Sequence, residues 1–172
     1  GTAVYEEAKP GTFDGTVLVM WVGGDSGSFG DGRFVYVPNF PGQSNSLKFT
    51  RSPQATAMSV VEVTPEWMYT DGGSIPRLVQ PVKGLNPWGY APAYMVHDWL
   101  FVARKCMNDG QATETEKQMA NVTFRETFEI MAEMLKTLEA DELISGSDVQ
   151  PAAITWAVST GISQSLWNET GE

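Results

Sequence analysis

The sequence predicts an α+β fold, in which antiparallel β-hairpins or a small sheet are followed by a loop-rich segment and three helices. β-branched and aromatic runs dominate the first third of the chain, whereas proline and glycine interrupt the middle. Apolar residues recur at helical spacing in the remainder. We therefore expect one domain over residues 1–172, strand-rich in 1–64, loop-like in 65–91 and helical in 92–172.

Four strands are predicted before the loop-rich segment. Residues 16–22 and 33–38 are rich in β-branched and aromatic side chains, and the glycine-rich residues between them predict a long hairpin. Two shorter strands are expected over residues 46–51 and 58–64, where nearby prolines limit their length.

Three helices are predicted after the loop-rich segment. The first begins near Pro92, which suits a first helical turn, and ends at the Asn-Asp-Gly sequence of residues 108–110. Thr113 and Glu116 form a capping-box pattern that opens a second helix of about 25 residues. A third helix is expected over residues 151–167, and the first two are expected to pack antiparallel. Acidic residues of the second helix are expected to form a solvated face: Glu114, Glu116, Glu126, Glu129 and Glu133.

Composition excludes several classes of function. The formal net charge of −10 at pH 7 repels phosphate backbones, so no nucleic-acid partner is expected. Cys106 is the only cysteine and His97 the only histidine, which excludes an internal disulfide and zinc sites that need two such ligands. No apolar run is long enough for a transmembrane helix, and the N-terminus lacks a signal-peptide pattern.

A glycine-rich motif at residues 71–77 is a candidate ion-binding or anion-binding loop. Gly72 and Gly73 allow the backbone to turn its carbonyls or amides toward a ligand, and Asp71 and Ser74 offer side-chain oxygens. The alternative is a simple turn in which these two side chains satisfy local backbone groups. The sequence leaves both interpretations open.

A histidine followed by an aspartate is the candidate catalytic pair. His97 lies on the apolar stripe of the first helix, and an ionised Asp98 is costly to bury unless it is paired or bound to a metal. If the second helix packs antiparallel, Asn121 can face His97, accept its ring N–H and fix its tautomer. His97 would then activate water as a general base. The alternative is a buried core histidine.

A hard cation, Ca²⁺, is the cofactor that this arrangement would suit. Asp98, with Asp71 and the backbone carbonyls of Gly72 and Gly73, would supply the oxygen ligands. The cation would stabilise the developing oxyanion as a Lewis acid. Residues of the glycine-rich motif and residues near the pair are candidates for substrate binding: Ser74, Arg77, Tyr94, Trp88 and Trp99.

Two motif blocks resemble a family catalogued as domain of unknown function 1353. They are Thr70-Asp71-x-x-Ser74-Ile75-Pro76-Arg77 with Gly89-Tyr90, and Ala93-x-x-x-His97-Asp98-x-Leu100-Phe101. The resemblance covers residues 46–135. It implies an origin in a phage or in a bacterium carrying phage genes, with the protein expressed in a bacterial host or associated with the virion.

A second, local resemblance is to phospholipase A2. Those enzymes carry His-Asp-x-x-Tyr on one helix after a glycine-rich calcium loop, and an aspartate on the next helix orients the histidine. His97 and Asp98 are similar to that pair. Phe101, however, occupies the position of the tyrosine, and Asn121 occupies the position of the aspartate. The resemblance implies calcium-assisted hydrolysis of a phospholipid or a small ester.

Two hypotheses of function follow. In the first, the chain is a calcium-assisted ester hydrolase that uses His97 as its base. In the second, it is a non-catalytic phage accessory or binding protein in which the pair of His97 and Asp98 is structural and Arg77 can neutralise Asp98. The helix over residues 151–167 carries a strip of small residues and two tryptophans, so it is a candidate either for covering the core or for contact with a second copy of the chain.

Overall fold

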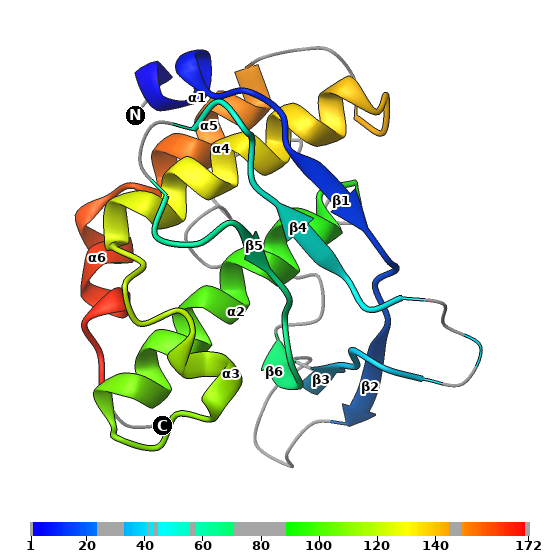
Figure 1. Ribbon diagram of the computed structural model, residues 1–172, viewed down its shortest axis with the longest axis vertical. Helices are drawn as coiled ribbons and strands as arrows, with labels where there is room; N and C mark the ends of the chain where they lie inside the picture. The colour runs from blue at the N-terminus through cyan, green and yellow to red at the C-terminus, as the bar shows by residue number, and fades with distance from the viewer. Residues whose placement is uncertain are drawn as a thin grey trace.

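The computed structural model describes residues 2–23, 33–40, 42, 45–55, 58–70, 89–144 and 149–170. Its described part has an α+β fold with two small antiparallel sheets and several helices, which confirms the predicted fold class (Figure 1). The elements are α1 (Thr2–Glu7), β1 (Thr12–Asp14), β2 (Val19–Gly23), β3 (Arg33–Tyr36), β4 (Lys48–Thr50), β5 (Glu62–Val63), β6 (Met68–Thr70), α2 (Ala91–Asn108), α3 (Glu114–Lys117), α4 (Phe124–Ala140), α5 (Val149–Val158) and α6 (Gly161–Trp167).

The strands form two three-stranded sheets with the orders β1-β4-β5 and β2-β3-β6. The predicted long hairpin is confirmed, because β2 pairs antiparallel with β3 and Val19 lies opposite Tyr36. Three elements were not predicted: α1, β1 and β6, the last of which lies in the segment predicted as loop. Each has only three to six residues, which is too short to show a hydrophobic period.

The second sheet has one buried face and one exposed face. Val19, Tyr36 and Met68 lie side by side across its three strands, and Tyr36 and Met68 are buried. The neighbouring row of Met20, Val35 and Tyr69 points the other way, because side chains alternate along a strand. We call this row the outer row, and 72% of Tyr69 is exposed there.

Helices α2 and α4 lie side by side and run in opposite directions, as predicted for the first two helices (Figure 1). The predicted helix of about 25 residues is wrong, because residues 118–123 interrupt it between α3 and α4. The capping box of Thr113 and Glu116 is present but caps only α3. Thr123 begins a new helix, since its side chain accepts a hydrogen bond from the backbone N–H of Glu126.

The predicted helix over residues 151–167 is likewise two helices, α5 and α6, which are separated at residues 159–160. Thr160 has extended backbone angles at the start of α6, so the chain turns there. Helix α5 packs against α1 and α4, whereas α6 packs against α2. No helix among the described residues has the length and apolarity needed to cross a bilayer.

A close backbone contact lies just after the end of β1 and just before the start of β4. Thr16 and Ser46 form an isolated parallel bridge, and Gly15 beside it has a φ of 83°. A Cβ atom at Gly15 would lie 2.2 Å from the carbonyl oxygen of Ser46, so glycine is required there for space as well as for its backbone angle.

Candidate functional site

Helix α2 positions the candidate catalytic pair. Its start and end agree with the prediction, because Pro92 occupies the first helical turn and Gly110, with a φ of 71°, follows the last one. The helix places most of its apolar side chains in the hydrophobic core. His97 lies among these buried residues.

The imidazole of His97 is enclosed by the protein. Only 2% of the residue is exposed, and its ring centroid lies 4.9 Å from that of Phe101, one turn later on α2. Burial lowers the pKa of His97 from 6.5 to about 4, because the charged form loses its hydration. The ring is therefore neutral at pH 7, and neither nitrogen has a hydrogen-bond partner in the described part of the chain.

The predicted hydrogen bond between Asn121 and His97 is absent. Asn121 is exposed in the turn between α3 and α4, outside either helix. The prediction extended the helical period of α4 backward through Thr123, where the helix in fact begins. The structure therefore does not bring these two predicted catalytic residues together.

Other predicted site residues on α2 lie in different environments. Tyr94 is 1% exposed, and burial, together with the nearby Tyr90 and Asp98, raises the pKa of its phenol. Its hydroxyl also lacks a partner in the part of the chain that is described. Asp98 is half-buried. Trp99 belongs to the hydrophobic core and points about 200° around the helix axis from His97.

The predicted calcium loop lies outside the described residues. Six of the predicted site residues are outside them: Asp71, Gly72, Gly73, Ser74, Arg77 and Trp88. Within the described ranges, no group of three or more His, Cys, Asp or Glu side chains could hold a metal ion. The calcium site therefore stays a prediction.

A buried ionic cluster, which sequence analysis missed, connects β4 to α4. Arg51 follows β4 and lies between two glutamates of α4: its Nη1 donates to Glu126 Oε1 at 2.6 Å, and its Nε donates to Glu133 Oε2 at 3.2 Å. The backbone N–H of Ser52 donates to Glu133, and that of Ser59 donates to Glu126. Arg51 and both glutamates are at most 4% exposed. The prediction of a solvated face is therefore wrong for Glu126 and Glu133, and also for Glu116, which is buried in α3.

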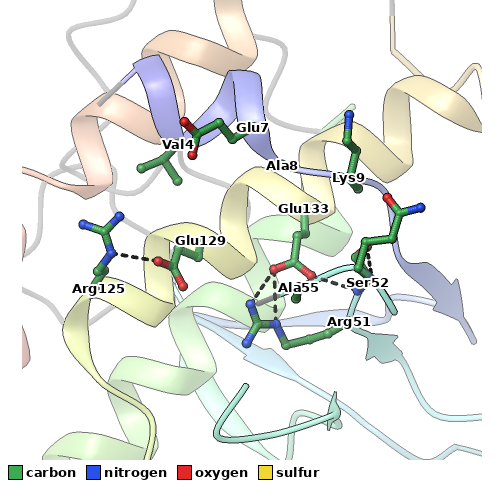
Figure 2. Close-up of a pocket in the computed structure, with 11 residues that line it drawn as sticks. Val4, Glu7, Ala8, Lys9, Arg51, Ser52, Ala55, Arg125, Glu129 and Glu133 are labelled. Atoms are coloured by element: carbon green, nitrogen blue, oxygen red, sulfur yellow. Dashed lines mark hydrogen bonds and ion pairs between the residues drawn. The ribbon is translucent and has the colours of Figure 1, made fainter. Parts of the chain in front are cut away.

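A surface cleft of about 190 Å³ opens beside this cluster (Figure 2). Glu133 forms its floor, and Arg125 donates to Glu129 at 2.8 Å along one wall. Glu7 and Lys9, from the N-terminal segment, line the other side. The lining contains three acidic side chains, Glu7, Glu129 and Glu133, and three basic ones, Lys9, Arg51 and Arg125, so their formal charges cancel.

A family model described as protein of unknown function (DUF1353) matches residues 49–140, more than half of the chain. The chain belongs to this family. The resemblance predicted from the two motif blocks is thus confirmed, and the DUF1353 match contains Arg51, His97, Glu126 and Glu133. No curated protein and no solved structure matches the chain significantly.

We expect the DUF1353 protein to lose stability in acid through His97. The folded pKa of about 4 lies below the unfolded value of 6.5, so this contribution is complete above pH 6.5 and is lost as the pH falls toward 4. The loss amounts to about 3 kcal/mol at 1.36 kcal/mol per pKa unit. Urea unfolding at pH 7 and pH 4 should show a smaller acid loss in His97→Leu, and identical losses in both proteins would contradict the expectation.

Removing one carboxylate from the buried cluster should destabilise the DUF1353 fold. We expect Glu133→Gln to cost about 3 kcal/mol in the free energy of unfolding, because the buried Arg51 loses a charged partner. Glu129→Gln, one turn earlier on α4, is the matched control and should cost less than about 1 kcal/mol, since its partner Arg125 is exposed. Equal costs in chemical denaturation would show that the buried cluster contributes no more than a surface pair.

Proposed function

We propose that this DUF1353 protein is a non-catalytic accessory or binding protein of phage or prophage origin, in which His97 and Asp98 serve the packing of α2. The observation that carries the proposal is the burial of the imidazole, which is 2% exposed. The absence of the predicted contact with Asn121 adds to it. The phage origin follows from the family resemblance.

A general base has two requirements. A base must reach the proton that it abstracts, either directly or through one water molecule, and its pKa should lie near the working pH. Burial removes the access of His97 to bulk water and lowers its pKa to about 4. A phospholipase-like histidine also needs a hydrogen-bond partner to orient it, and Asn121 does not fill that role.

A second candidate function is the calcium-assisted hydrolysis of a phospholipid or a small ester. One observation favours it: both ring nitrogens of His97 lack a partner within the described residues, so either is free to accept a proton. Asp98, the next residue of α2, is half-buried and would bind Ca²⁺ with Asp71 and the carbonyls of Gly72 and Gly73. In this candidate the cation would supply most of the stabilisation of the oxyanion.

A calcium titration separates the two candidates. For an accessory protein we expect no change of Tm with Ca²⁺ and no release of fatty acid from mixed phospholipid micelles. A calcium site would stabilise the fold by about 2.7 kcal/mol at a Ca²⁺ concentration about 100-fold above Kd. Asp98→Asn should abolish that shift and Asp141→Asn, at the exposed end of α4, should retain it. Fatty-acid release that His97→Ala abolishes would contradict the accessory role.

We also propose that two copies of the chain associate through residues 151–167. Three large apolar side chains of α5 and α6 are exposed and support this: Trp156, Ile162 and Leu166. Sedimentation velocity over a range of concentrations should then show a dimer that Trp156→Ser weakens. A monomer at all concentrations would contradict the association.

A further inference from the structure

One edge of the second sheet is long and apolar. In the sheet orders β1-β4-β5 and β2-β3-β6, the outermost strands are β1, β5, β2 and β6. Three of these have only two or three residues, and charged residues occur in two of them, Asp14 in β1 and Glu62 in β5. Short strands and charged side chains are common means by which proteins keep a sheet edge from pairing with another chain. β2 has five residues and lacks both forms of protection.

The sequence around β2 does not block pairing either. Residues 15–24 contain no charged residue and no proline, and residues 17–22 are an uninterrupted apolar run, the type of segment that pairs readily with other strands. The register of β2 against β3 becomes irregular only after Trp21, so residues 19–21 keep a regular edge, which we call the β2 edge. Figure 1 shows β2 on the outside of the molecule.

The backbone of β2 presents hydrogen-bonding groups along this edge. The N–H of Val37 donates to the carbonyl oxygen of Leu18 at 3.0 Å, so Leu18 and, two residues later, Met20 direct their backbone groups toward β3. Val19 and Trp21 alternate with them and direct their N–H and C=O groups away from β3. Among the strands that the structure describes, only β3 pairs with β2. Two donors and two acceptors are therefore available to an added strand.

Apolar side chains accompany the β2 edge on both faces of the sheet. Met20, of the outer row, is exposed, and Trp21, which points to the opposite face, is 65% exposed. Trp21 shares its face with the buried Tyr36, so its exposure shows that this end of β2 extends beyond the hydrophobic core. A strand added here would cover apolar surface on both sides of the sheet.

We propose that the β2 edge binds an extended segment of another protein, apolar at its centre and basic at its ends, as a fourth strand of the second sheet. The proposal rests on the proposed role as a binding protein and states the kind of partner. The outward backbone groups of Val19 and Trp21 hold the segment, and its alternate side chains pack beside Met20 and Trp21.

The charge of the chain favours a segment of another protein over a second copy of β2. A second copy brings another net charge of −10 to the edge, which opposes its approach. Basic residues that flank an apolar segment are attracted instead, and this attraction speeds encounter and discriminates against acidic partners. The self-association proposed through residues 151–167 uses different elements, α5 and α6.

Hydrogen exchange in the unmodified protein provides the direct test. The probe is the synthetic peptide Lys-Lys-Val-Thr-Val-Thr-Val-Lys-Lys, and its control has proline in place of the central valine, which removes a pairing N–H group. At a concentration about tenfold above its Kd, the probe should slow exchange of the Val19 and Trp21 N–H groups by about tenfold. The N–H of Met20, which faces β3, should not change. No slowing with the probe up to about 1 mM, or equal slowing with the control, overturns the proposal.

Two variants of Trp21 separate the backbone from the side chain. Trp21→Ala removes the indole and keeps the outward N–H, whereas Trp21→Pro removes that N–H as well and spares the ladder with β3. Fluorescence anisotropy of the labelled probe should show binding to Trp21→Pro about fivefold weaker than to Trp21→Ala, the effect of one hydrogen bond. Retained protection of the Met20 N–H shows that the proline variant is folded. Equal affinities of the two folded variants overturn the proposal.

A peptide with glutamate in place of each lysine tests the charge of the partner. It should bind about tenfold more weakly than the probe in low salt, and the two affinities should approach each other in about 1 M salt. Equal binding in low salt overturns the assignment of a basic partner. Slower exchange at Val19 and Trp21 on raising the protein concentration without peptide would show that a second copy occupies the edge. The calcium and fatty-acid experiments concern His97 and Asp98, so a failure here is distinguishable from a failure of the accessory role.

Discussion

A buried arginine between two glutamates ties the strand-forming part of the chain to its helices. Arg51 directly follows β4, and its partners Glu126 and Glu133 lie two turns apart on α4. Each glutamate also accepts a backbone N–H from the segment that connects β4 to β5. Five hydrogen bonds thus converge on one face of α4. A rotation or slide of that helix would leave at least one buried charge unpaired, which is far more costly than the loss of a surface pair.

The net contribution of such a cluster to the free energy of unfolding is smaller than its short hydrogen bonds suggest. Desolvating three charges offsets much of their attraction, and apolar residues of the same shape often stabilise a fold equally well. The cluster does constrain geometry, because the N–H groups of Arg51 are directional and point to two fixed glutamates. The cleft of Figure 2 lies beside the cluster, so its floor has the same fixed geometry.

Sequence patterns over a few neighbouring residues predicted those elements whose structure depends mainly on neighbouring residues. The β2–β3 hairpin and both ends of α2 follow from β-branched runs, from Pro92 and from Gly110. The buried cluster could not be found in this way, because Arg51 is 75 and 82 residues from its partners. A helical pattern treats every glutamate as solvent-facing, and only tertiary contacts distinguish Glu133 from Glu129. The placement of Asn121 failed because a hydrophobic period was continued across the start of a helix at Thr123.

The outer row of the second sheet has a consequence for the behaviour of the protein in concentrated solution. Met20 and Tyr69 expose apolar surface, while a net charge of −10 opposes contact between the outer rows of identical chains at low ionic strength. In about 1 M salt the screening length falls to about 3 Å, and that repulsion no longer acts between molecules. High salt therefore favours contact between outer rows, in addition to the association proposed through residues 151–167.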